Sequence, residues 1–430
     1  MLKALNLAQR RDLRRLFAAG LLFWMSLSAF LPTLPRYVQD LGGSPQIIGL
    51  TMTSFAVGLL LSRPAVDALG NRHGYRAVLW VGMGSLVVAP LGYWLFPSVA
   101  VVVVMRGIQG ISIAAFATAY MALVADWAPP HQRGELIGTM SLINPIGMSI
   151  GPVFGEALRV HGGYGSLFAI TAGLALGGML VIADIRQAGS YPQGSPVMQG
   201  SLGRVWRQER IAIPSLVMLL AGLAFGTLST FVAVFIPTTG TDLNPGWFYG
   251  TAALASFGMR WKAGAASDRS GRGIWISFCL LCMAMSLVVL SLAHQPWHFL
   301  LAGWMEGLGF GLLIPMFSAW ISDRSQPGER ARLLNLCTGG FDGGIALAGP
   351  LAGSLVVGLG YRPTFAVAAG MALLSWILFA TRGNYTLSQS WQFALGNGLD
   401  QFAEPVTESR LGVPVHALDP ARGEFGDEPY

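Results

Sequence analysis

Three charged residues stand inside long apolar stretches of this sequence. Arg106 lies in VVVVMRGIQGIS, Glu306 in LAGWMEGLGFGLL and Asp342 in CTGGFDGGIAL. Ionisable side chains at the depth of a bilayer are rare, and they commonly mark the pathway of an ion or a substrate. We therefore take these residues as the first candidates for binding and proton transfer.

Glu306 is the candidate for reversible protonation. A carboxylate in surroundings of low dielectric can bind and release a proton near neutral pH, and a nearby cation such as Arg106 favours its charged form. Movement that separates the two would therefore switch the protonation state. The structural alternative is a fixed ion pair that only holds helices together. Asp342 stands among four glycines and is either structural or the proton-coupling residue itself.

A second group of residues forms a polar signature that occurs twice, 197 residues apart. Arg63 begins the first copy and Arg260 begins the second. Carboxylates can face the N-terminus of a neighbouring helix, and arginines can reach facing carboxylates, so such contacts can hold a gate in one conformation. A loop that is charged only to stay in water is the alternative. The predicted gate residues are Asp67, Asn71, Arg72, Gly74 and Arg76, and then Gly264, Asp268, Arg269, Gly271 and Arg272.

A third pattern consists of glycines at intervals of four residues, which lie on one face of a helix. They are Gly147, Gly151 and Gly155, with Pro152 beside the second. Such small residues allow helices to pack closely, and the proline removes one backbone hydrogen bond and permits a bend. We predict that these residues form a flexible seam at which the halves rock, or that they only allow close packing between helices. The two interpretations are compatible.

The segments that carry these residues are long and apolar. The chain of 430 residues is 53% hydrophobic and only 11% charged, against about 25% charged in a soluble domain. A spanning helix needs about 20 apolar residues, and long continuous runs exclude a transmembrane β-barrel. We predict an all-α membrane protein with twelve spans, at 16–38, 46–68, 77–96, 98–124, 135–158, 165–185, 211–237, 246–266, 274–293, 298–321, 333–358 and 363–381.

The basic residues are distributed unequally between the two sides of these spans. Most arginines fall on the side that holds both termini and both polar signatures, which predicts that this side is cytoplasmic. The net charge of +6 is therefore a signal of topology and does not indicate nucleic acid. Three cysteines inside apolar segments indicate no disulfide framework, and we predict no metal and no cofactor.

The 197-residue offset extends beyond the polar signature. Asp126 and Arg133 correspond to Asp323 and Arg330, while GPVFGEAL at Gly151 corresponds to GPLAGSLV, one residue out. Six spans in each copy give parallel repeats, a known transporter arrangement with the substrate site between the halves. The predicted domains are 1–185, a linker at 186–210, 211–381, and a polar cytoplasmic tail at 382–430 that we expect to be disordered.

These motifs resemble the major facilitator superfamily over roughly residues 1–385. Its loop pattern G-x-x-x-D-R-x-G-R-[RK] is matched from Gly264, whereas the first copy has Asp67, Asn71 and Tyr75 in place of Gly, Asp and Arg. RGIQG at Arg106, Gln109 and Gly110 is similar to an element of helix 4. The helix 5 glycines and LPTLPRYVQDLGGS are similar to drug:proton antiporters.

The resemblance implies a twelve-helix fold whose helices 1, 4, 7 and 10 line a central cavity, so that Arg106, Gln109 and Glu306 face it. It also implies that the loop carboxylate docks near helix 11 and the arginine near helix 4. We therefore predict a monomeric transporter, not an enzyme, that works in a bacterial inner membrane. It would export a small molecule in exchange for protons. A proton symporter for uptake and a non-transporting receptor or scaffold are the alternatives.

Overall fold

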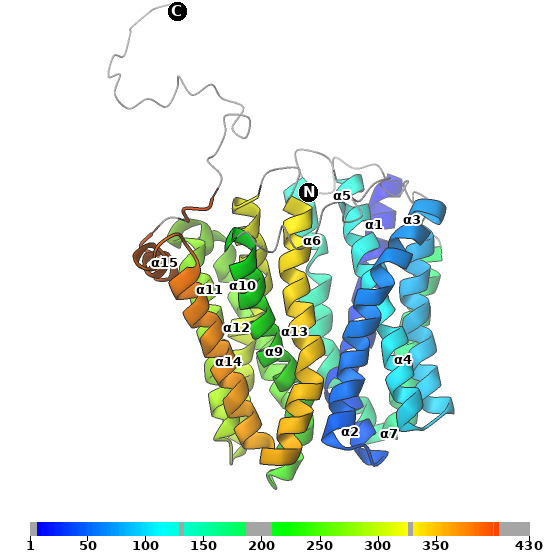
Figure 1. Ribbon diagram of the computed structural model, residues 1–430. Coiled ribbons are helices and arrows are strands. Elements are labelled where there is room, and N and C mark those ends of the chain that lie inside the picture. The colour runs from blue at the N-terminus through cyan, green and yellow to red at the C-terminus, as the bar shows by residue number, and fades with distance from the viewer. Residues whose placement is uncertain are drawn as a thin grey trace, which may run out of the picture.

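The computed structural model describes residues 7–128, 133–183, 185, 209–325, 330–398 and 400–403, with side chains throughout except at 7–8, 133–135, 209–210, 261–270, 330–332 and 335. Every regular element in these ranges is a helix (Figure 1). In chain order they are α1 (Leu7–Ser28), α2 (Phe30–Asp40), α3 (Pro45–Leu95), α4 (Val99–Ser112), the π-helical η2 (Ile113–Ala117), α5 (Thr118–Trp127), α6 (Arg133–Met140), α7 (Ile143–Ala183), α9 (Glu209–Thr238), α10 (Gly246–Ser270), α11 (Arg272–Ser291), α12 (Pro296–Asp323), α13 (Arg330–Leu359), α14 (Tyr361–Arg382) and α15 (Leu387–Ala394).

Nine helical segments in the described residues are long and apolar enough to cross a membrane. Two of them, Pro45–Leu95 and Leu136–Ala183, are too long for one crossing, and each is interrupted by one glycine with non-helical backbone angles. The predicted all-helical membrane fold is confirmed, and the number of twelve spans stays a prediction.

The chain reverses direction at glycines that occupy equivalent positions in the two predicted repeats. Gly74 has φ 75° and Gly271 has φ 82°, and they lie 197 residues apart. Gly163 has φ 70° and Gly360 has φ 87°, at the same offset. Positive φ is readily reached only by glycine. Both pairs therefore place the same backbone conformation at equivalent points of the repeat, which supports a duplicated fold.

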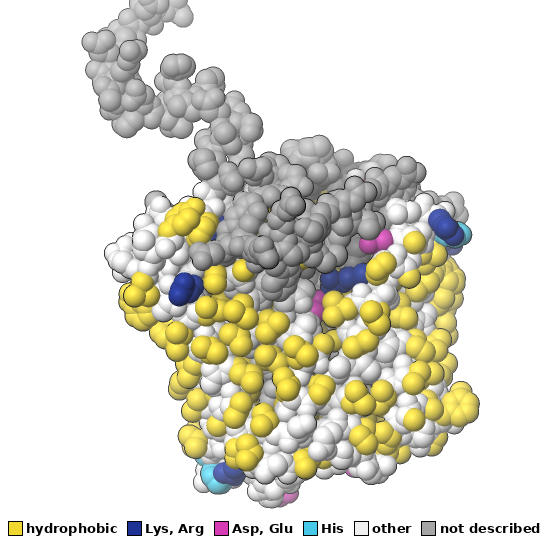
Figure 2. All heavy atoms as spheres, in the orientation of Figure 1, with side chains coloured by type: hydrophobic (Ala, Val, Ile, Leu, Met, Phe, Trp, Pro, Cys, Tyr) yellow, Lys and Arg dark blue, Asp and Glu magenta, His cyan; other side chains and the backbone are white. Residues whose placement is uncertain are grey.

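The outer surface of the bundle is apolar around its middle. Figure 2 shows hydrophobic side chains over the length of the helices, with charged side chains near the two ends. Leu61, Leu180 and Leu254 are among the most exposed, at 75%, 64% and 69%. An apolar surface of this extent is incompatible with water, whereas it suits the hydrocarbon interior of a bilayer.

The N-terminal half (α1–α7) meets the C-terminal half (α9–α14) where α2 packs against α9, and in two further interfaces. In one, α3 packs against α13, where a Cβ on Gly49 would overlap the carbonyl group of Gly349. Thr53 Oγ1 donates to the Ala346 carbonyl oxygen at 2.6 Å in the same interface. In the other, α7 packs against α10, with Val153 beside Gly250. Gly49 stands four residues after the start of α3, which follows the end of α2, so this contact lies near α2. We call this part of the bundle the α2 end; the opposite end carries α15 (Figure 1).

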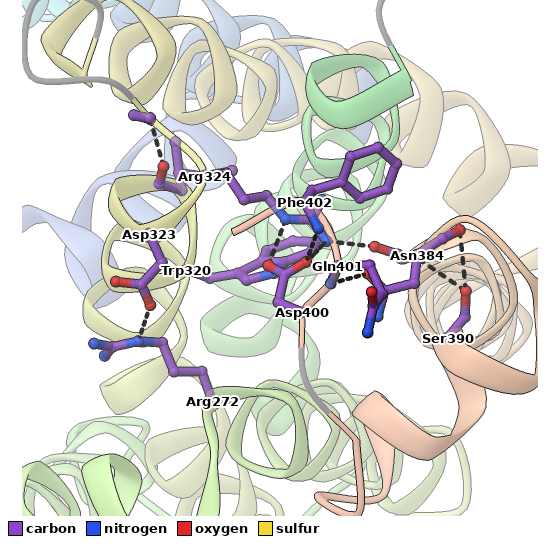
Figure 3. A network of polar contacts seen from close by, with 12 residues as sticks. Arg272, Trp320, Asp323, Arg324, Asn384, Ser390, Asp400, Gln401 and Phe402 are labelled. Carbon is purple, nitrogen blue, oxygen red and sulfur yellow. Dashed lines mark hydrogen bonds and ion pairs between the residues drawn. The ribbon is translucent and has the colours of Figure 1, made fainter. Parts of the chain in front are cut away.

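The prediction that residues 382–430 are disordered is wrong for the first part of this segment. After α14 the chain forms α15, which packs against α11 and α14, and then returns so that Asp400 reaches α12. Asp400 accepts two hydrogen bonds from Arg324, at 2.6 Å from Nε and 2.8 Å from Nη2, and one from Trp320 Nε1 at 2.8 Å (Figure 3). Phe393 is buried against the ring of Phe379. Residues 404–430 lie outside the described residues.

Burial lowers the pKa of the Arg324 guanidinium, and the paired Asp400 carboxylate acts in the opposite direction. Arg324 also donates to the Gly383 carbonyl oxygen and lies over the Phe402 ring, 4.8 Å from its centroid. Residues 382–430 are polar on average. Aromatic residues that cover a buried arginine outweigh the polar residues between them.

Candidate functional site

A cavity of about 80 Å³ lies between the two halves of the bundle. Its walls come from α2, α7, α9, α10 and α12. Aromatic rings make up much of the lining, from Phe225, Phe248, Tyr249 and Phe310. The remaining polar groups of the lining are Asn144, Ser149, Ser229, Ser256, Arg260 and Glu306. Apolar walls with a few polar groups are typical of a small-molecule site.

Three glycines of α12 place Glu306 in this wall. A Cβ on Gly303, Gly307 or Gly311 would overlap atoms of α10, so the spacing of four residues brings the two helices into close contact. Glu306 lies next to this seam, and only 7% of its surface is exposed. Its carboxylate makes no hydrogen bond or ion pair with any residue that the structure describes.

The other deeply buried glutamate has the opposite surroundings. Glu156 is 1% exposed and accepts hydrogen bonds from Arg36 at 2.8 Å and from Arg159 at 2.7 and 3.0 Å. Buried carboxylates are normally paired in this way. Glu306 therefore departs from the pattern that the same chain follows elsewhere.

Arg106 and Gln109 lie in a separate network inside the N-terminal half. Arg106 Nη1 donates to Gln109 Oε1 at 2.5 Å, and the guanidinium stands 4.5 Å from the centroid of the Phe55 ring. Tyr93 Oη donates to the same Gln109 oxygen at 3.1 Å. Neither Arg106 nor Gln109 lines the cavity of Glu306. The structure therefore does not bring Arg106 and Glu306 together as a fixed pair in this conformation.

Asp342 has a partner on the other half. Arg63 Nη2 donates to Asp342 Oδ2 at 2.9 Å, which joins α3 to α13. Both side chains are partly exposed, at 40% for Arg63 and 23% for Asp342. An ion pair between the two halves is suited to stabilise one arrangement of them.

The two predicted gate sequences make equivalent contacts through different residues. In the second copy Arg272 pairs with Asp323. In the first copy Tyr75 stands where the motif has arginine, and its hydroxyl donates to Asp126 Oδ2 at 3.1 Å. Asp126 and Asp323 are 197 residues apart, as are Tyr75 and Arg272. Both copies therefore have this contact, although Tyr75 lacks the positive charge that Arg272 carries.

The remaining gate residues of the first copy are exposed or half-buried. Asn71 and Arg72 are exposed, and Asp67 is half-buried. Arg76 Nη2 donates to the Ala183 carbonyl oxygen at 2.7 Å, at the end of α7. Gly264, Asp268 and Arg269 belong to the stretch 261–270, whose side-chain surroundings lie outside what the structure describes. Their predicted roles therefore stay predictions.

The glycines of α7 face α1 within the N-terminal half. A Cβ on Gly147 would meet Trp24, and one on Gly151 or Gly155 would meet Ser28 or Ala29. Ser28 Oγ donates to the Gly147 carbonyl oxygen at 2.9 Å. Pro152 is buried in the same helix. These residues therefore provide close packing between α1 and α7.

Sequence analysis did not identify Arg260 as a cavity residue. It was treated as the first residue of the second polar signature, yet its side chain lines the same cavity as Glu306. Its Nε is buried and has no hydrogen-bond partner among the described residues. The predicted span 246–266 contained the relevant signal, because it already includes Arg260, as the span 46–68 includes Arg63.

The fold, the apolar belt and an internal cavity between two helical halves define a multi-pass membrane transporter. Residues 16–265 and 216–395 match the sequence model of the Major Facilitator Superfamily. The chain belongs to this family of transporters, which are not enzymes. Its substrate is therefore a small molecule, and its surroundings are a lipid bilayer.

Two curated relatives and one solved structure illustrate the similarity. An uncharacterised MFS-type transporter of Salmonella typhimurium is 26% identical over 379 residues, covering 84% of this chain and 93% of the relative. The multidrug resistance protein MdtG of the same organism is 24% identical over 388 residues, covering 85% and 94%. A crystal structure of the nucleoside transporter NupG has a TM-score of 0.72 at 13% identity, covering 85% of this chain and 98% of that one.

Proposed function

We propose that this transporter exports a small molecule in exchange for protons, and that Glu306 carries the proton. The observation that supports this most directly is the burial of Glu306 in the cavity without a cationic partner among the described residues. An unpaired buried carboxylate is costly in its charged form. Proton binding removes that cost, and a cationic group of a substrate can replace the proton.

Alternating access provides the mechanism. The halves are in close contact at the α2 end, through Gly49 and Gly349 and through Val153 and Gly250. The cavity lies farther along the bundle, and its 80 Å³ is smaller than the roughly 300 Å³ or more of a typical ligand pocket. Substrate entry therefore requires the halves to separate from this arrangement. The two halves would be the domains 1–185 and 211–381, joined by 186–210.

Export as the direction of transport is supported by similarity alone. One relative is named a multidrug resistance protein, and the glycine motif of α7 and the stretch LPTLPRYVQDLGGS are similar to motifs of drug:proton antiporters. We place the protein in a bacterial inner membrane as a monomer, with both termini in the cytoplasm. The excess of arginine on that side supports this orientation.

Flux measurements with purified protein in proteoliposomes test the proposal. Substrates would first be found by a growth screen of a deletion strain against toxic compounds. Protons should then cross the vesicle membrane in the direction opposite to the substrate, and an internal pH-sensitive dye should report the resulting change of pH in the lumen. Glu306→Gln should abolish proton-driven transport while exchange down a substrate gradient continues.

Asp342→Asn is the matched control, because it also replaces one carboxylate at bilayer depth by an amide. It should retain proton-driven transport. Full proton-driven activity in Glu306→Gln would contradict the proposal, and loss in Asp342→Asn alone would assign the proton to α13. Movement of proton and substrate in the same direction would identify a symporter instead.

A further inference from the structure

The repeat relates the two interfaces between the halves, and one of them lacks an ion pair that the other has. Arg63 on α3 corresponds to Arg260 on α10 at the offset of 197. Asp342 on α13 corresponds to Asn144 on α7, because GPLAGSLV at Gly349 follows GPVFGEAL at Gly151 by 198 residues. Arg63 and Asp342 pair at 2.9 Å. The equivalent of Asp342 is an amide, so the carboxylate that pairs with Arg63 has no counterpart for Arg260 at this position.

Arg260 and Asn144 both line the cavity that contains Glu306. Arg260 Nε is buried without a hydrogen-bond partner, and its guanidinium forms no ion pair with the part of the chain that the structure describes. A buried cation without a partner is costly. An anionic group of a molecule bound in the cavity would remove this cost.

Glu306 and Arg260 lie at different depths of the same cavity. Gly303 is beside Phe248 and Gly307 is beside Ala252, so Glu306 is level with a residue nine positions before Arg260. At 1.5 Å per residue their backbones are about 13 Å apart along the helix axis. This separation is too large for a direct ion pair to be favoured. The rings of Phe225 and Phe310, which also line the cavity, stack on each other with centroids 4.0 Å apart.

We propose that the cavity binds amphoteric molecules with an apolar body, whose acidic group is held by Arg260 and whose cationic group takes the place of the Glu306 proton. This inference rests on the proposed function and names its substrate class. A carboxylate or phosphonate oxygen accepts two parallel hydrogen bonds from a guanidinium. The aromatic rings bind the body, and the two charged groups fix its direction in the cavity.

A set of three biphenyl probes tests the charge preference by calorimetry on the full-length protein. The probes are 4′-(aminomethyl)biphenyl-4-carboxylate, its 4-carboxamide, and 4′-(hydroxymethyl)biphenyl-4-carboxylate. They carry both charges, only the cation, and only the anion. The probe with both charges should bind most tightly. A charge-assisted hydrogen bond predicts that the carboxamide binds about tenfold or more weakly.

Two substitutions should remove this preference by different routes. Arg260→Gln deletes the cation, and Asn144→Asp supplies the missing carboxylate to neutralise it. In both variants, the affinity for the doubly charged probe should fall about tenfold or more, to the value for the carboxamide. The affinity for the carboxamide itself should stay unchanged. Arg260→Lys should retain part of the preference. Arg63→Gln is the matched control, since it deletes the equivalent arginine and should leave the order of the probes unchanged.

Three results would overturn the inference: no binding of the doubly charged probe, equal losses for both amines in Arg260→Gln, or an unaltered preference in Asn144→Asp. Melting curves of every variant exclude misfolding as the reason for a loss. The flux assay of Glu306→Gln is read separately. Persisting proton-driven transport there would defeat the proposed exchange, while the probe order would still report whether Arg260 binds acids.

Discussion

Arg63 Nη2 lies 2.9 Å from Asp342 Oδ2, in an ion pair that connects the N-terminal half to the C-terminal half. Asp342 stands twelve residues after the start of α13 at the α15 end, and the closer helix contacts lie toward the α2 end. Within the described part of this interface, the ion pair therefore lies nearer the α15 end than those helix contacts do. It is suited to restrict opening toward the α15 end.

The first prediction concerns this pair. Arg63→Gln or Asp342→Asn should favour opening at the α15 end by roughly 0.2–1 kcal/mol, because both side chains are partly exposed and screened by solvent. That corresponds to at most about a fivefold change in population. Labelling of a single cysteine introduced into the cavity, with the native cysteines replaced, should become faster from the α15 side.

A double-mutant cycle separates the pair from other effects. Arg63→Asp combined with Asp342→Arg should restore the labelling rate toward that of the parent protein, since the attraction is re-formed with its charges exchanged. Additive effects of the two substitutions would show that the contact does not hold the halves.

The second prediction concerns Tyr75 and Asp126. Tyr75→Phe removes the hydroxyl that donates to Asp126 and should lower the free energy of unfolding by roughly 1 kcal/mol. Tyr75→Arg should recover part of this loss, because the equivalent residue, Arg272, pairs with Asp323. Chemical denaturation in detergent provides the measurement. Equal stability of the parent and the phenylalanine variant would mean that the hydrogen bond makes no net contribution.

Sequence patterns predicted the backbone of this protein better than its site. Gly74 and Gly271 could be predicted as turns because a positive φ is a local property that only glycine adopts easily. The apolar segments likewise carry their own signal, since each must span the same hydrocarbon thickness. The repeat offset then related the two halves without any knowledge of their packing.

The cavity lining depends on how the helices are rotated, which local patterns do not determine. Glu306 was predicted because an isolated carboxylate in an apolar segment is conspicuous. Arg260 begins a run of polar residues within the predicted span 246–266, so its type and position do not single it out in the sequence. Arg106 was assigned to the cavity, whereas the structure places it with Gln109 and Phe55, outside the cavity that Glu306 lines. That contact depends on α3, which is distant in sequence.

The third prediction concerns the turn at Gly74. Gly74→Ala should lower the free energy of unfolding by roughly 1–2 kcal/mol, because its φ of 75° is strained for any residue with a Cβ. Gly84→Ala is the control in the same helix segment, where nothing lies within 4 Å of an added Cβ. It should be neutral or stabilise by up to about 1 kcal/mol. A smaller loss at Gly74 than at Gly84 would contradict the assigned conformation.

The last prediction concerns the segment that follows α14. Asp400 accepts three hydrogen bonds from Arg324 and Trp320, and Arg324 is only 2% exposed. Asp400→Asn leaves this buried cation without its carboxylate, which costs about 3–5 kcal/mol in comparable sites. The cost is limited by release of the segment, so α15 and the residues after it should detach while the bundle stays folded.

Hydrogen exchange measures that release directly. The amides of α15 should exchange about 100-fold faster in Asp400→Asn, as a loss of roughly 3 kcal/mol implies, while those of α12 near Glu306 keep their rates. Gln392→Ala, at an exposed position of α15, should change neither set. Unchanged exchange in α15 of the Asp400 variant would show that aromatic packing around Phe393 holds the segment without the ion pair.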